Sequence, residues 1–279
     1  MNIRIVTDST CDLPKDIIRK LGISIVPDYI NVGEQSFLDE VEITREEFYK
    51  RLPKFSTYPK TSAPGVGIFE NVYHKLALEG ATHIVSVHIT NKLSNLANVA
   101  RLAGEIAKNI KVIVMEIGSL SMGLGFLVVA AARAALEGCS VEKILEVLKE
   151  QDSRTHVYAA IDTLEFLKRS GRVPGLVAGI ADLLHIRPIL HLHKGIIKIE
   201  KVRTAKKAIE RIITHIKKLG PLEELGVIHT NAEQKAQQFT RFLQKTLFLD
   251  YDPWIVEATP IIGVHTGPGA IGLACIKAK

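Results

Sequence analysis

The first half of the chain alternates short runs of β-branched residues with amphipathic stretches of helical length, and this alternation constrains the fold most strongly. Strands are expected at residues 3–6, 23–30, 83–89 and 111–115, and helices at 14–21, 44–51, 66–79, 94–108, 121–136 and 141–151. Strands that alternate with helices build a parallel sheet with helices on its faces. The pattern therefore predicts a Rossmann-like α/β domain.

The polar run at residues 151–155 interrupts the apolar pattern, and the pattern changes beyond it. A hairpin is expected at residues 187–201, then a helix at 204–218 and short strands at 226–229, 254–258, 261–265 and 272–276. Because 279 residues exceed the usual size of one hydrophobic core, we predict two domains. Residues 1–153 are expected to form an N-terminal α/β domain with a parallel sheet. Residues 154–279 are expected to form a C-terminal α/β domain with a mixed sheet.

The composition excludes several classes of protein. A hydrophobic fraction of 47% and a charged fraction of 24% are typical of an ordinary globular protein. The net charge of +6 comes from basic residues interleaved with acidic ones, and the densest basic run, 201–207, has no aromatic residue, so we expect no nucleic-acid partner. The longest apolar stretch, 122–132, is shorter than the roughly 20 residues of a membrane span. We expect no stable membrane insertion.

Cysteine and histidine positions argue against a disulfide framework and a metal site. Cys11, Cys139 and Cys275 are odd in number and lack a CxxC spacing. His191 and His193 share one face of an expected strand, but no carboxylate or cysteine cluster accompanies them, so half-buried or surface histidines are the favoured interpretation. The first charged residue comes too early for a signal peptide. We therefore expect a cytoplasmic protein without a metal or a cofactor.

Polar residues gather at expected strand ends and helix starts, where open α/β sheets bind their ligands. They are Asp8 and Ser9 after the first strand, Thr61 and Ser62 in a loop before a helix, and Ser94 and Asn95 after the strand at 83–89. Hydroxyls and free backbone N–H groups in such places suit an anion or a carboxylate. Helix capping alone is an equally simple role for Asp8 and Ser9.

A glycine-rich segment near the end of the sequence matches the GxGxxG pattern at residues 267–272. A dinucleotide site needs a further helix and strand, and only seven residues remain, so we interpret Gly267 as a turn or a close approach to a ligand. This interpretation leaves His265 and Thr266 at a strand end. Hydroxyls, His265 and Asp8 would also suit a serine hydrolase, but the sequence has no GxSxG turn.

Motifs spread over nearly the whole chain resemble the DegV family. They are IVTDST at 5–10, IVP at 25–27, KTSAP at 60–64, SLSMGLG at 119–125, DTLEFLKRSGR at 162–172, IRPIL at 186–190, KVRT at 201–204 and GVHTGPG at 263–269. The resemblance implies a two-domain fold that binds a long-chain fatty acid and presents it to a separate fatty acid kinase for acyl-phosphate formation. The fatty acid is then the ligand, and the chain itself is not an enzyme.

The resemblance also implies roles for particular residues. Thr61 and Ser94 are expected to bind the lipid carboxylate, with His265 and Arg203 completing the polar network, and Arg172 is expected to contact the phosphate or the partner. Supporting positions are Asp8, Ser9, Ser62, Asn95, Thr266 and Gly267. A buried carboxylate must be matched by donors, because an unpaired charge away from water costs several kcal/mol.

The acyl chain is expected to supply the affinity. At about 0.8 kcal/mol per buried methylene, a long chain contributes on the order of 10 kcal/mol before ordering costs. A tunnel with apolar walls is therefore expected, and the segment 122–132 is either one of its walls or ordinary core.

Two segments depart from the family pattern. SNLANV at 94–99 stands where relatives read SGTYQS, so Asn95 replaces a glycine, and Glu116-Ile117 stands where Asp-Ser is usual.

Two alternatives to the carrier follow from the residues. One is an acyl-ester hydrolase or transferase that uses Ser94 or Ser9 with His265 as the base. The other is a protein that has lost lipid binding.

Overall fold

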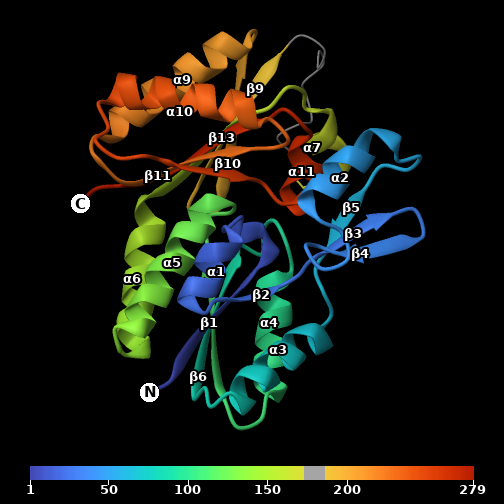
Figure 1. Ribbon diagram of the computed structural model, residues 1–279, viewed down its shortest axis with the longest axis vertical. Helices are drawn as coiled ribbons and strands as arrows, with labels where there is room; N and C mark the ends of the chain where they lie inside the picture. The colour runs from blue at the N-terminus through green and yellow to red at the C-terminus, as the bar shows by residue number, and fades with distance from the viewer. Residues whose placement is uncertain (173–185) are drawn as a thin grey trace.

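The computed structural model describes residues 1–172 and 186–279, and these residues form a parallel, a mixed and a three-stranded sheet (Figure 1). The parallel sheet has the order β2-β1-β6-β7, with β1 (Ile3–Asp8), β2 (Ser24–Val26), β6 (His83–Ile89) and β7 (Lys111–Ile117). The helices of this half are α1 (Lys15–Leu21), α3 (Val66–Leu78), α4 (Leu96–Ile106), α5 (Met122–Leu136) and α6 (Val141–Arg154). The predicted α/β fold with a parallel sheet is confirmed.

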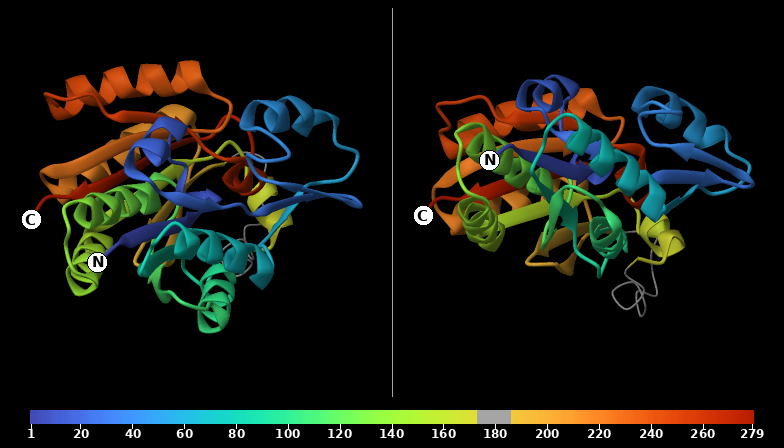
Figure 2. Two further views of the ribbon diagram at one scale, coloured as in Figure 1. Left: turned by 60° about the horizontal axis from the view of Figure 1, so that its bottom comes forward. Right: turned by 90° about the horizontal axis from the view of Figure 1, so that it is seen from below.

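A small antiparallel sheet projects from the side of the molecule, as Figures 1 and 2 show. It has the order β4-β3-β5 and contains β3 (Tyr29–Val32), β4 (Gln35–Leu38) and β5 (Lys60–Ser62), accompanied by α2 (Arg45–Arg51). The single strand expected at 23–30 was wrong, since its two halves join different sheets. Pro27, which has no backbone N–H, lies at the break. Thr61, expected in a loop, pairs with Ile30 inside β5.

The mixed sheet has the order β10-β9-β8-β13-β11-β12, and only the pair β11–β12 within it is parallel. Its strands are β8 (Thr155–Ala160), β9 (Arg187–His193), β10 (Ile196–Val202), β11 (Leu222–His229), β12 (Trp254–Glu257) and β13 (Ile271–Lys277). In the part of this half that the structure describes, the helices are α7 (Glu165–Ser170), α9 (Ala205–Leu219), α10 (Glu233–Leu247) and α11 (Pro260–Thr266). The short 3-10 helices are η1 (Ser9–Cys11) and η2 (Leu52–Lys54).

The strand expected at 261–265 was wrong, because these residues form α11. Pro260 occupies the first turn, where its missing N–H costs nothing, and Gly267 with φ +74° follows the last residue. These two signals outweigh the β-branched run between them. His265 therefore lies in the last turn of a helix rather than at a strand end.

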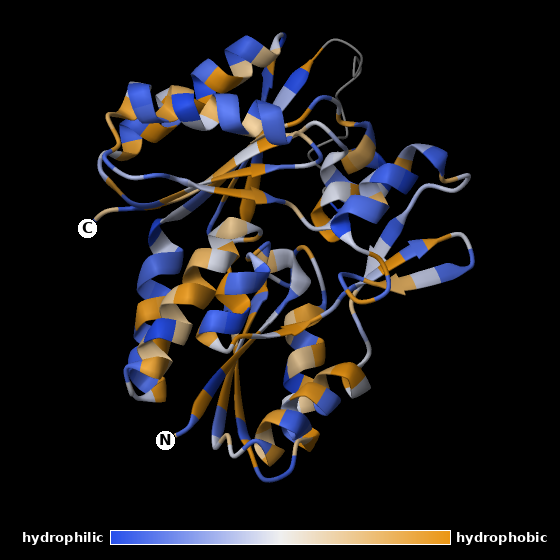
Figure 3. Ribbon diagram, viewed as in Figure 1, coloured by the Kyte–Doolittle hydropathy of each residue, from blue (hydrophilic) through white to orange (hydrophobic). Residues whose placement is uncertain are grey.

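The helix α5 joins the two halves of the core. Its residues from Met122 to Val129 are buried, and it packs on β1 on one side and on β11 and β13 on the other. Figure 3 shows that hydrophobic residues are concentrated on α5 and the sheet strands, whereas α9 and α10 alternate between hydrophilic and hydrophobic residues. The apolar face of these two helices packs on the outer face of the mixed sheet.

We propose that the chain divides into domains at residues 1–153 and 154–279, next to the junction of α6 and β8. Within residues 1–172 and 186–279, no helix has the length and apolar character needed to cross a membrane.

Candidate functional site

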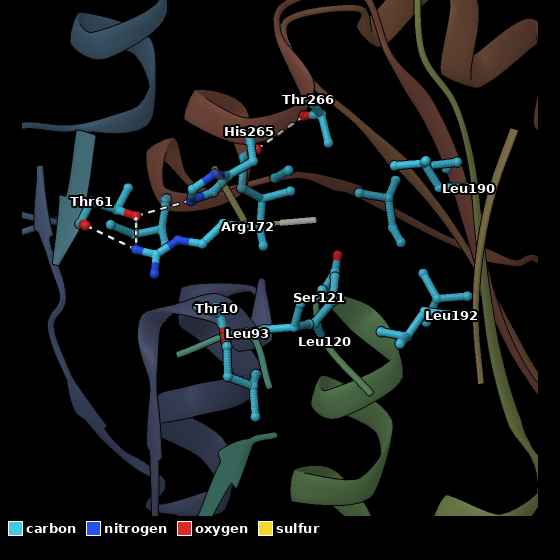
Figure 4. Close-up of a pocket in the computed structure, with 18 of the residues that line it drawn as sticks. Thr10, Thr61, Leu93, Leu120, Ser121, Arg172, Leu190, Leu192, His265 and Thr266 are labelled. Atoms are coloured by element: carbon cyan, nitrogen blue, oxygen red, sulfur yellow. Dashed lines mark hydrogen bonds between the residues drawn. The ribbon is translucent and has the colours of Figure 1, made fainter. Parts of the chain in front are cut away.

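A pocket lies between the carboxyl ends of the parallel strands, the inner face of the mixed sheet and α11. It holds about 1120 Å³ of empty space, part of it open to solvent. Both halves of the chain contribute to the wall, and the two ends of the pocket differ in character (Figure 4).

One wall is apolar because the side chains of β8 and β9 alternate between the two faces of the mixed sheet. Val157, Ala159, Leu190 and Leu192 face the pocket. The intervening residues His156, Tyr158, His191 and His193 stack on one another, with His156 and His193 rings 4.0 Å apart. Leu190 and Leu192 lie on the opposite side of the pocket from Thr61 (Figure 4).

At the polar end of the pocket, Thr61 contacts both His265 and Arg172 (Figure 4). Thr61 Oγ1 lies 2.9 Å from His265 Nε2, and the Arg172 guanidinium donates to the Thr61 carbonyl oxygen at 3.0 Å. The sequence placed Thr61 and His265 in one site and gave Arg172 a separate role. The structure brings all three residues together.

The charge at this end is set mainly by Arg172. Burial, and then the positive charge of Arg172, lower the pKa of His265 to about 3, so its imidazole is neutral. Burial, followed by the charges of Asp8 and Asp39, raises the pKa of Asp28, which also lines the pocket, and this favours its protonated form. A guanidinium beside neutral donors is suited to one carboxylate.

His265 has further hydrogen-bonding capacity. Its Nδ1 is buried and has no hydrogen-bond partner among residues 1–172 and 186–279. A buried nitrogen without a partner costs free energy, so a ligand atom that bonded it would bind more tightly.

Other predicted residues also line the pocket. Ser94 and Thr266 do so from α4's leading turn and from α11, and Ser62 does so from β5. The Thr266 hydroxyl donates to the Ile262 carbonyl at 3.0 Å, and Ser62 Oγ accepts from Asn31 Nδ2. Ser94 Oγ makes no hydrogen bond within the described ranges, so its proton is available to a ligand.

The remaining predicted residues lie away from the pocket wall. Arg203 is exposed in the turn between β10 and α9 and does not line the pocket, so the geometry gives no support to its predicted place in the carboxylate network. Asn95 is exposed, and its side chain accepts from Asn98 Nδ2 at 2.8 Å rather than entering the pocket. Gly267 packs behind the site, where a Cβ atom would lie 2.5 Å from the Phe166 ring.

Asp8 and Ser9 support the pocket from beneath. Asp8 accepts from the Thr10 N–H and hydroxyl, and its other oxygen lies 2.7 Å from His88 Nδ1. Ser9 Oγ donates to Asp28. Neither Asp8 nor Ser9 lines the pocket, whereas Thr10 and Asp28 do. Capping and orientation of these two neighbours are the roles that the contacts indicate.

The geometry gives little support to a hydrolase. His265 bonds Thr61 rather than Ser94, Ser9 bonds Asp28, and a neutral imidazole with a pKa of about 3 is a poor base near pH 7. His88 does bridge Asp8 and Ser86, at 2.7 Å on each side. These three side chains are fully buried, however, and none lines the pocket.

The structure also shows where the segment 122–132 and the pair His191 and His193 lie. No residue of the segment 122–132 lines the pocket, so this part of α5 belongs to the core. Leu120 and Ser121, just before α5, do line the pocket. In residues 1–172 and 186–279, no group of three or more His, Cys, Asp or Glu is arranged to hold a metal ion. His191 and His193 instead belong to the stack behind the pocket wall.

Among the described residues, the pocket is mostly apolar and ends in the Arg172 guanidinium and several neutral hydrogen-bonding groups, a combination that suits an amphipathic ligand with an anionic head. The model of the DegV family, described as uncharacterised, matches residues 2–278. A DegV domain-containing protein of Halalkalibacterium halodurans is 33% identical over 276 residues, covering 98% of this chain and 97% of the relative. The chain therefore belongs to the DegV family.

Solved structures of relatives share the fold. DegV of Bacillus subtilis, described as a fatty acid binding protein, has a TM-score of 0.89 and 31% identity, covering 99% of this chain and 100% of the other. A DegV family protein of Thermus thermophilus, described by its fatty acid binding, has a TM-score of 0.87 and 32% identity, with both chains covered completely.

Proposed function

We propose that this protein binds one long-chain fatty acid in the pocket, with its carboxylate at Thr61, His265 and Arg172. The observation that carries the proposal is the contact of Thr61 with His265 and with Arg172 at one end of a mostly apolar pocket. The fatty acid binding described for the relatives from B. subtilis and T. thermophilus supports it.

The two parts of the ligand have separate roles in this proposal. Arg172 provides the charge-assisted hydrogen bond, and Thr61, Ser94 and His265 provide neutral donors. The acyl chain lies along the wall formed by β8 and β9, where each buried methylene contributes about 0.8 kcal/mol. The head group determines orientation, and the tail provides most of the affinity.

We also propose that the bound acid is presented in the cytoplasm to a separate fatty acid kinase for acyl-phosphate formation. The chain has no GxxxxGK[ST] motif for a nucleotide, so the phosphoryl donor would be bound by the partner. The exposed Ser62 beside Thr61 indicates that the polar end lies near the surface.

Organic extraction and mass spectrometry of the purified protein test the binding proposal. One copurified fatty acid per chain is expected, and delipidated protein should take up one equivalent of added fatty acid. Protein that neither retains nor takes up any fatty acid would refute it. The kinase role is tested separately, by acyl-phosphate formation from the loaded protein, ATP and a purified kinase subunit.

A further inference from the structure

The turn that carries Ser94 is fastened by one carboxylate from the neighbouring strand. Glu116, near the end of β7, accepts through Oε1 from the Thr90 hydroxyl at 2.9 Å and from the Asn91 N–H at 2.8 Å. Its Oε2 accepts from Asn91 Nδ2 at 2.8 Å and from Arg101 at 3.3 Å. Both oxygens of Glu116 are thus used to hold the start of the turn against β7 and α4.

The backbone connects this anchor directly to Ser94. The N–H groups of Leu93 and Ser94 donate to the Thr90 carbonyl oxygen, at 2.9 and 3.2 Å. Leu93 and Ser94 line the pocket, whereas Glu116 does not. A displacement of Thr90 therefore moves the Ser94 hydroxyl relative to the pocket.

A second set of contacts fixes the outer side of the turn. Asn98 accepts from Asn91 Nδ2 at 3.1 Å and from Arg101 at 2.6 Å, and it donates to Asn95 Oδ1 at 2.8 Å. Asn95 thus points toward α4. The same amide network includes Glu116 through Asn91 and Arg101.

Glu116 is suited to this role because it stays ionised. Although burial alone would raise the pKa of Glu116, the hydrogen bonds from Asn91, Thr90 and Arg101 and the charge of Arg101 lower it below its usual value. Charge-assisted hydrogen bonds are about twice as strong as neutral ones, so the carboxylate holds the turn more firmly than an amide would.

We propose that Glu116 is a positioning residue for carboxylate recognition, which fixes the turn from Thr90 to Asn95 so that the Ser94 hydroxyl faces the ligand head group. This inference rests on the proposed function. It adds a residue that touches neither the pocket nor the ligand.

A double-mutant cycle on the full-length delipidated protein tests the inference. The variants are Glu116→Ala, Ser94→Ala and the double variant, with palmitate and methyl palmitate as probes. Glu105→Ala is the matched control, since Glu105 is exposed on the same α4 helix and lies outside the network. Thermal unfolding of each variant is measured in parallel.

Glu116→Ala and Ser94→Ala are each expected to weaken palmitate binding about tenfold, which is typical of a lost hydrogen bond to a charged group. Methyl palmitate binding should change less than about twofold, because its ester head group is uncharged and the lost hydrogen bond is correspondingly weaker. Both substitutions are expected to remove the same contact, that of the Ser94 hydroxyl with the carboxylate. The double variant should therefore bind palmitate with the same affinity as Ser94→Ala. Glu116→Asp, which keeps the charge, should recover part of the affinity.

Equal losses for the acid and the ester, additive losses in the double variant, or unchanged palmitate binding in Glu116→Ala would each overturn the positioning role while leaving the proposed function intact. Wild-type protein that binds no palmitate or any other fatty acid would instead overturn the proposed function, and this inference with it.

Discussion

Thr61 and His265 are 204 positions apart in the sequence, yet the Thr61 hydroxyl and His265 Nε2 are 2.9 Å apart. Arg172, which is 111 positions from Thr61, bonds the same residue. The polar end of the pocket therefore exists only when β5, the end of α7 and α11 are packed together. Changes behind these elements are expected to affect binding as much as changes in the pocket wall.

Arg172 is expected to provide the positive charge for the ligand, and Arg203 is not. Arg172→Met should weaken palmitate binding roughly ten- to a hundredfold, because it removes a charge-assisted hydrogen bond. Arg203→Met is the matched control, since it removes the same charge from an exposed turn outside the pocket. Isothermal titration of delipidated protein distinguishes them. Equal losses in both variants would show that net charge, rather than contact, governs affinity.

Asp39 is expected to make stability fall as pH rises. Its carboxyl is buried, and this burial raises its pKa from 3.8 to about 8. The unfolded chain ionises Asp39 above pH 3.8 while the folded chain keeps the proton, so folded stability decreases as pH rises toward 8. Asp39→Asn removes this dependence.

Chemical denaturation between pH 5 and 8 measures the effect. The free energy of unfolding of Asp39→Asn relative to wild type should rise with pH, by at most about 1.4 kcal/mol per pH unit. Asp250→Asn, at an exposed position, serves as the control and should show no trend. A constant difference between Asp39→Asn and wild type would contradict a raised pKa.

Gly267 is expected to be intolerant of any side chain. A Cβ atom there would lie 2.5 Å from the Phe166 ring of α7, and the φ of +74° is unfavourable for other residues. Gly267→Ala should lower the free energy of unfolding by about 1–3 kcal/mol and weaken palmitate binding, because α7 precedes Arg172.

Two companion variants separate the causes. Gly67→Ala, where a Cβ meets nothing within 4 Å, should not destabilise the protein. Phe166→Ala removes the ring that the new Cβ would overlap, but it does not relieve the backbone strain at position 267. Gly267→Ala should therefore cost less free energy of unfolding in the Phe166→Ala background than in wild type, but still more than zero. If Gly267→Ala alone were as stable as wild type, α7 would have to move away from the new Cβ atom without a loss in the free energy of unfolding.

The sequence was most informative where local chemistry decided the outcome. The strands of the parallel sheet were predicted from short β-branched runs that alternate with amphipathic helical stretches. Thr61, Ser94 and His265 were assigned to one site through the family motifs. The structure places all three in the pocket wall. Contacts with a ligand remain a proposal.

The sequence was least informative where packing between distant segments decided the outcome. Nothing local distinguishes Arg172 from Arg203, because only the packing of α7 on α11 brings one guanidinium to Thr61. The strand expected at 261–265 failed because a helix start at Pro260 outweighed β-branched residues. The network around Glu116 joins two strand ends and α4, and sequence reasoning identified it only as a departure from the family pattern.

Leu192 is expected to limit the length of the acyl chain. It lies across the pocket from Thr61 on β9 (Figure 4), so a chain anchored at Thr61 extends toward it. In wild type, affinity for saturated fatty acids should rise about fourfold per added methylene, from about 0.8 kcal/mol each, until the chain reaches this wall. Leu192→Phe should bring that plateau forward to shorter acids, as measured by titration with a series of chain lengths. His193→Phe changes the opposite face of the same strand and should leave the plateau in place. An unchanged plateau in Leu192→Phe would mean that the acyl chain leaves the polar end in another direction.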